Sequence, residues 1–127
     1  MVLKIYLVAC AFVFVPYGLM CFLNPALLID SAGIQAISPT GTTELRAMYG
    51  GLQTAVGILA IFALLRPSLT NAFLVTLITM MTGLLLARLA GTTFDGGFTG
   101  YTGMALAFET IFLSSSLYFL KTLGRDD

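Results

Sequence analysis

Few side chains in this sequence can do acid, base or anion-binding chemistry. Of its 127 residues, 9% are charged, six basic and six acidic, and none is histidine. A chain without histidine has no imidazole to serve as a general base, a haem ligand or a metal ligand. We therefore expect no metal site, no cofactor and no catalytic residue. The charged residues that are candidates for such chemistry are Glu44, Arg46, Arg88, Asp95 and Glu109.

Helix electrostatics account for two of these charges and not for two others. Glu44 opens a predicted helix and Arg88 closes one, so both complement the helix dipole. Arg46 falls in a predicted first turn, where the dipole disfavours a cation. Glu109 falls eight residues into a predicted helix, where an ionised carboxylate facing lipid would cost several kcal/mol. We therefore expect Glu109 to turn away from lipid and to pair with Arg88.

Tyr49 and Gln53 follow Arg46 at the three- and four-residue spacing of one α-helical face. This spacing predicts a polar pocket in the half of the membrane away from the chain termini. Two guanidinium groups and a carboxylate suit an anionic or carbonyl-bearing head group, such as that of a lipid or a quinone. The alternative is an ion-pair network that only fixes how the helices dock. The pocket residues are Arg46, Tyr49, Gln53, Arg88 and Glu109, with Glu44 and Asp95 in support.

The elements that must position these charges are membrane-spanning helices. Hydrophobic residues make up 58% of the chain, and about 20 apolar residues cross a bilayer as a helix. So few charges exclude a soluble enzyme, and the lack of a basic cluster argues against a nucleic-acid partner. We expect an all-α integral membrane protein, a single four-helix bundle over residues 1–127. The predicted spans cover residues 5–23, 44–65, 69–90 and 101–120.

The connections between the spans differ in length. Only residues 66–68 separate spans two and three, which predicts an antiparallel helical hairpin. Residues 24–43 are too many for a turn and keep apolar side chains. They predict a short interfacial helix over about 25–31, with Asn24 as N-cap, Pro25 at the first helical position and a stop near Gly33.

Small residues predict where helices approach one another and where the chain turns. Residues 91–100 hold four of the thirteen glycines, which predicts an irregular loop. Small residues at helical spacing let helix backbones come close in a membrane. Such stripes are Gly50 with Gly57, and Gly83, Ala87 and Gly91. Cys10 and Cys21 lie too far apart on one helix for a disulfide, and we expect them to act as small packing or lipid-facing residues.

The charges outside the spans predict the orientation. With four spans, both termini and the connection at 66–68 lie on one side of the membrane. That side carries four basic residues, whereas the loops of the other side carry Asp30 and Asp95 and no Lys or Arg. Because basic loops stay in the cytoplasm, both termini are expected there. The four basic residues are Lys4, Arg66, Lys121 and Arg125.

Taken together, these charged positions resemble the pattern of a known family. The residues that carry the resemblance are Glu44-x-Arg46-x-x-Tyr49-Gly50-Gly51, Arg88, Asp95-Gly96 and Glu109. They are similar to the bacterial family called domain of unknown function 4345, within the wider DoxX-like group of small four-helix membrane proteins. The resemblance covers nearly the whole chain and implies a four-helix bundle in a bacterial inner membrane. It implies no reaction, although some DoxX-like relatives are associated with redox complexes.

These observations favour a non-catalytic membrane protein that binds a lipid-like or quinone-like molecule, forms a homo-oligomer or docks on a larger membrane complex. Two other functions stay open. A quinone-linked redox accessory subunit would bind a quinone in the pocket, but without a Cys-x-x-Cys or flavin motif the chain cannot relay electrons alone. A small proton-coupled transporter would use Glu109, whereas small multidrug exporters carry their essential glutamate in the first span, which has no charge here.

Overall fold

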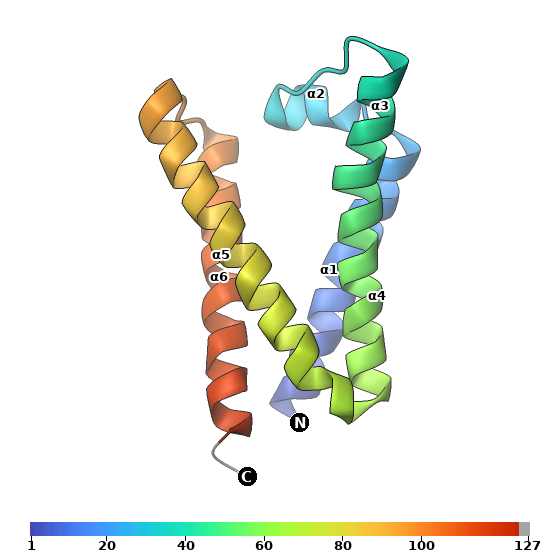
Figure 1. Ribbon diagram of the computed structural model, residues 1–127, viewed down its shortest axis with the longest axis vertical. Coiled ribbons are helices and arrows are strands. Elements are labelled where there is room, and N and C mark those ends of the chain that lie inside the picture. Colours follow the sequence, from blue (N-terminus) through green and yellow to red (C-terminus); the bar gives the residue numbers. More distant parts are fainter. Residues whose placement is uncertain (125–127) are drawn as a thin grey trace. The chain divides into compact units, whose positions relative to one another are not determined.

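The computed structural model describes residues 1–124, and every element in that range is a helix (Figure 1). Four helical runs are long and apolar enough to cross a membrane: Val2–Leu23, Pro39–Leu65, Pro67–Asp95 and Gly100–Leu123. The predicted fold class, with a short helix between the first two spans, is confirmed. The elements are α1 (Val2–Leu23), α2 (Leu27–Ala32), α3 (Pro39–Leu45), η1 (Arg46–Gly51), α4 (Leu52–Leu65), η2 (Pro67–Leu69), α5 (Thr70–Asp95) and α6 (Gly100–Leu123).

The chain forms two compact units, Met1–Thr70 and Asn71–Asp127, the second described as far as Gly124. The first unit contains α1 to η2, and the second contains nearly all of α5 and the whole of α6. Arg125, one of the four basic residues that predict the orientation, lies outside the described residues.

In the first unit, one face of α1 packs against η1 and α4 (Figure 1). Its buried residues recur every three or four positions, as one face of an α-helix requires. They are Leu7, Cys10, Phe14, Gly18 and Cys21. Both cysteines are buried and free, so they serve as packing residues.

Glycines let these helices approach at backbone distance. A Cβ built at Gly50 would lie 2.8 Å from Phe22 Cα, and one at Gly57 would lie 2.8 Å from Val15 N. A Cβ at Gly18 would likewise meet backbone of the partner helix. The predicted stripe of Gly50 and Gly57 is therefore confirmed as a close contact. Since the higher residue number of one helix meets the lower of the other, α1 and α4 run antiparallel.

The second predicted stripe does not form such a contact in the described residues. Nothing lies within 4 Å of a Cβ built at Gly83, and at Gly91 the nearest atom is Asp95 Oδ2, 3.8 Å away in the same helix. Small residues at helical spacing permit a close approach and do not enforce one.

The second span begins five residues before the predicted Glu44. Ser38 is the N-cap of α3, where its hydroxyl accepts the Gly41 N–H over 3.1 Å, and Pro39 occupies the first helical position. Serine followed by proline is a helix-start signal that the hydropathy pattern hides, because residues 38–43 are polar or small. Glu44 and Arg46 consequently lie beyond the first turn, and the prediction that they open the helix is wrong.

The third span continues five residues beyond its predicted end, through Asp95. The hydroxyls of Thr92 and Thr93 both donate to the Leu89 carbonyl, at 2.8 and 2.9 Å. These two polar side chains therefore find their hydrogen-bond partner within the helix itself. The helix ends before Gly96, whose φ of 66° is the left-handed conformation typical of a helix end. The irregular connection is therefore much shorter than the predicted loop over 91–100.

The helix α2 confirms the predicted short helix, with a shifted start. It covers Leu27–Ala32 and ends at Gly33, whose φ of 69° is left-handed. Asn24 is not its N-cap, because the helix is preceded by a turn in which the Asn24 carbonyl accepts the Leu27 N–H over 3.2 Å.

Between spans two and three, the short 3₁₀ turn η2 confirms a tight connection. The antiparallel hairpin itself involves both units and stays a prediction.

Replacing Gly50 with alanine is expected to lower the free energy of unfolding by about 1–3 kcal/mol, because the new methyl group meets the Phe22 backbone. The matched control is Gly83→Ala, in open space within α5. It should keep or raise stability by up to about 1 kcal/mol, since alanine is the better helix former. Unfolding by sodium dodecyl sulfate in mixed micelles measures both, and equal stability of the two variants would contradict the close contact.

Candidate functional site: an ion pair between α5 and α6

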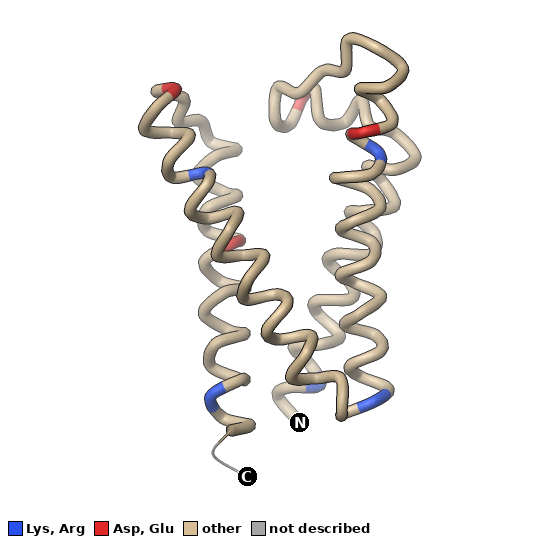
Figure 2. Tube along the Cα trace, viewed as in Figure 1, with Lys and Arg blue, Asp and Glu red and all other residues tan. Residues whose placement is uncertain are grey.

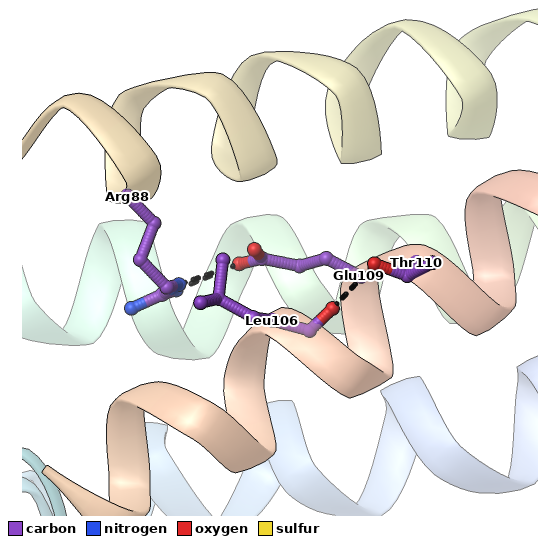
Figure 3. Close-up of polar contacts among 4 residues, drawn as sticks. All are labelled: Arg88, Leu106, Glu109 and Thr110. Carbon is purple, nitrogen blue, oxygen red and sulfur yellow. Dashed lines mark hydrogen bonds and ion pairs between the residues drawn. The ribbon is translucent and has the colours of Figure 1, made fainter. Parts of the chain in front are cut away.

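Arg88 of α5 and Glu109 of α6 form an ion pair within the second unit (Figure 3). Arg88 Nη2 donates to Glu109 Oε1 over 2.7 Å, and Arg88 Nε donates to the same oxygen over 3.0 Å. Glu109 is 2% exposed, whereas the Arg88 side chain is 27% exposed. The predicted pairing is confirmed, and it ties the two helices of the unit together.

The pair uses only one of the two carboxylate oxygens. Glu109 Oε2 is buried and has no hydrogen-bond partner among the described residues. The neighbouring hydroxyl of Thr110 is not available, because it donates to the Leu106 carbonyl over 2.7 Å (Figure 3). A buried acceptor without a donor costs about 1–3 kcal/mol. The site can therefore accept one more hydrogen bond at a fixed position.

Both members of the pair lie well inside their helices. Glu109 is the tenth residue of α6, about 14 Å from its start by helical rise. Arg88 lies seven residues before the end of α5, so it does not close its helix as predicted. Most charged residues lie near the ends of helices (Figure 2). Among the described acidic residues, Glu109 is the one that is buried.

Arg46 is held by the end of α1. Its Nη1 donates to the Phe22 carbonyl in the last turn of that helix, and its guanidinium lies 5.7 Å from the centroid of the Phe22 ring. A cation at a helix C-terminus complements the dipole and satisfies a carbonyl that has no partner in its own helix. Sequence reasoning missed Phe22, because a main-chain carbonyl leaves no signal in the residue type. This contact accounts for Arg46 without a ligand.

The segment that carries Arg46 and Tyr49 is π-helical, over Arg46–Gly51. A π-helix bonds residue i to i+5, so a spacing of three residues does not place side chains on one face as it does in an α-helix. The spacing argument that joined Tyr49 and Gln53 to Arg46 does not hold across this segment. Instead, Arg46 and Gly50 both meet Phe22.

The two supporting residues of the predicted pocket are exposed. Glu44 lies in α3, and Asp95 is the last residue of α5 rather than part of a loop. The structure brings together Arg88 and Glu109 among the seven predicted site residues. Glu44, Arg46, Tyr49 and Gln53 belong to the first unit, so the pocket that combines residues of both units stays a prediction.

Comparison with known proteins places the chain in a family. The sequence profile of the domain of unknown function DUF4345 matches residues 2–120, and the chain belongs to this family. No curated protein sequence and no solved structure matches it. The protein is thus a four-span membrane protein of a family whose description names no activity.

Breaking the ion pair is expected to be costly, and removing it whole is not. Arg88→Met alone should lower the free energy of unfolding by about 3–5 kcal/mol, because it leaves the buried Glu109 charge unpaired. Glu109→Met alone should cost less, because the Arg88 that it leaves is partly exposed. The double variant should recover most of that loss. Asp30→Asn, at an exposed carboxylate of α2, is the control and should change stability by less than about 0.5 kcal/mol. Losses that simply add in the double variant would show that the two side chains are not coupled.

Proposed function

We propose that this protein binds the polar head group of a lipid-like or quinone-like molecule at the Arg88–Glu109 ion pair, without catalysing a reaction. The observation that carries the proposal is a carboxylate buried in a membrane-spanning helix with one oxygen paired and the other without a partner. Ionisable groups in membrane spans are costly and mark functional sites. A purely structural pair would be expected to satisfy both oxygens.

The two side chains offer different chemistry to a ligand. Arg88 is the partly exposed member, and its planar guanidinium suits a carbonyl or phosphate oxygen. Glu109 is the buried member and offers an acceptor. A molecule dissolved in the bilayer would reach Arg88 first and Glu109 behind it. This combination recognises a head group with both an acceptor and a donor.

Other functions would use the same pair differently. A redox accessory subunit would hold a quinone there for a partner protein that carries the electrons, as the proposed kinship with the DoxX-like group suggests. A proton-coupled transporter would have to open the pair whenever Glu109 takes up a proton, so transport ranks behind binding. A structural role in docking on a membrane complex or in a homo-oligomer needs no retained small molecule.

Native mass spectrometry of the gently purified protein is expected to show a retained small molecule. Arg88→Met and Glu109→Gln should lose it. Arg46→Met should keep it, because that guanidinium is engaged at Phe22, and so should the control Asp30→Asn. Loss in Arg46→Met as well would support the wider pocket with Tyr49 and Gln53. Equal retention in every variant would refute binding at the ion pair, and a retained protein partner without a small molecule would favour docking.

We also propose that both termini lie in the cytoplasm and that the membrane is a bacterial inner membrane. The antiparallel packing of α1 and α4 supports this orientation within the first unit. It puts Lys4, near the start of α1, at the same end as Arg66, which follows α4. Asp30 and Glu44 belong to the elements at the opposite end. Arg46 also belongs to that end, but it is bound to α1 within the unit. Lys4 and Arg66 at one end, with Asp30 and Glu44 outnumbering Arg46 at the other, fit the positive-inside rule.

Labelling of an introduced cysteine tests the orientation. Ser31→Cys in α2 and Ser68→Cys in η2 are matched substitutions at exposed serines, and the two native cysteines are buried. A membrane-impermeant maleimide applied to cells with a permeabilised outer membrane should label the cysteine at 31 and spare the one at 68. Breaking the inner membrane should expose both. The reverse pattern in intact cells would place the termini outside.

A further inference from the structure

We propose that the molecule bound at the Arg88–Glu109 ion pair carries a hydroxyl group that donates a hydrogen bond to Glu109 Oε2. This inference rests on the proposed function and narrows the class of ligand. Lipid phosphodiesters, esters, ethers and oxidised quinones offer acceptors, which Arg88 can bind and Glu109 cannot. A hydrogen bond to Oε2 is open only to ligands that have a donor group.

The geometry of the pair fixes where the donor must lie. Both guanidinium bonds go to Oε1, at 2.7 and 3.0 Å, so the positive charge is on one side of the carboxylate. Oε2 takes no part in these bonds, and it belongs to a residue that is 2% exposed. An ionised carboxylate only accepts hydrogen bonds, through two oxygens. Its second oxygen, Oε2, therefore selects for a ligand group that donates a hydrogen bond, as a hydroxyl does.

The described part of the chain does not supply that donor itself. Thr110, the hydroxyl next in sequence, donates to the Leu106 carbonyl, and Ser114 donates to the Thr110 carbonyl over 2.6 Å. Both hydroxyls are thus used along α6, as is usual for hydroxyl side chains in apolar helices. A donor from outside the described residues is the remaining way to satisfy Oε2 of the ionised carboxylate.

Two kinds of membrane molecule share this chemistry. A quinol presents phenolic hydroxyls where the corresponding quinone presents carbonyls. A glycerolipid with a free glycerol hydroxyl presents an aliphatic one. A single buried water molecule would also satisfy the oxygen, and it is an outcome that the experiment must recognise.

The test compares hydroxyl compounds with their methyl ethers, which keep the shape and lose the donor. The probes are decylhydroquinone and its dimethyl ether for the quinol source, and 1-oleoylglycerol and its dimethyl ether for the lipid source. Binding to the delipidated full chain in detergent is measured by isothermal titration calorimetry. One hydroxyl compound should bind about tenfold tighter than its ether or more, which is the size of effect expected of a hydrogen bond to a charged group. The pair that shows the preference identifies the source.

The double variant Arg88→Met/Glu109→Met removes the acceptor without leaving an unpaired charge, and it should bind hydroxyl and ether equally. Infrared difference spectra supply a second readout. The hydroxyl compound should shift a carboxylate band that is missing in Glu109→Gln, and Asp30→Asn should keep the band. Equal binding of hydroxyl and ether to the unchanged protein, or no binding of either, overturns the inference and leaves water as the partner of Oε2. The proposed function is tested separately by the retained molecule, because a retained ligand without a hydroxyl would support binding and refute this inference.

Discussion

A membrane interior offers no hydrogen-bond partner to a polar group, and each feature of this structure meets that constraint in its own way. Backbone groups are satisfied within helices, which is why every element of the described chain is a helix. Hydroxyl side chains on the spans donate to carbonyls of their own helix, as Thr54 does to Gly50 and Thr79 does to Val75. Such bonds allow polar residues to occur in apolar helices without a ligand or a partner helix.

Charged groups cannot be satisfied so locally, and the two units meet the constraint differently. In the first unit, Arg46 reaches the Phe22 carbonyl at the end of α1, a site with the partial negative charge of a helix C-terminus. In the second unit, Glu109 takes both of its hydrogen bonds from Arg88. Arg46 binds a backbone carbonyl, which the close contact between Gly50 and Phe22 places within reach. Glu109 instead needs the side chain of Arg88, and only one of its two oxygens receives hydrogen bonds.

The missing hydrogen bond at Glu109 distinguishes a candidate binding site from an ion pair that is only structural. Arg46 is explained by contacts within its own unit, so it no longer needs to be part of a pocket. Glu109 is only half explained, since its second oxygen is buried without a donor. The description of the family names no activity with which the chemistry of this site could be compared. The chemistry of the carboxylate oxygen is therefore the best guide to what the protein binds.

The number of spans and the Arg88–Glu109 pair were predictable from the sequence. Hydropathy is a local property that sums along a helix, and a lone carboxylate within a span needs a cation from a nearby helix. Helix ends were less predictable: the Ser38 cap and the Thr92 and Thr93 back-bonds each extended a span by five residues through polar segments that hydropathy treats as loops.

Only the tertiary structure decided which atoms meet. The π-helical turn at Arg46–Gly51 and the contact of Arg46 with Phe22 depend on the register between α1 and the second span. The use of Glu109 Oε1 alone depends on how α5 and α6 are rotated toward each other. Rotation and register are set by packing among residues far apart in the chain. Residue types therefore determined that Glu109 needs a partner, and packing determined which of its oxygens received one.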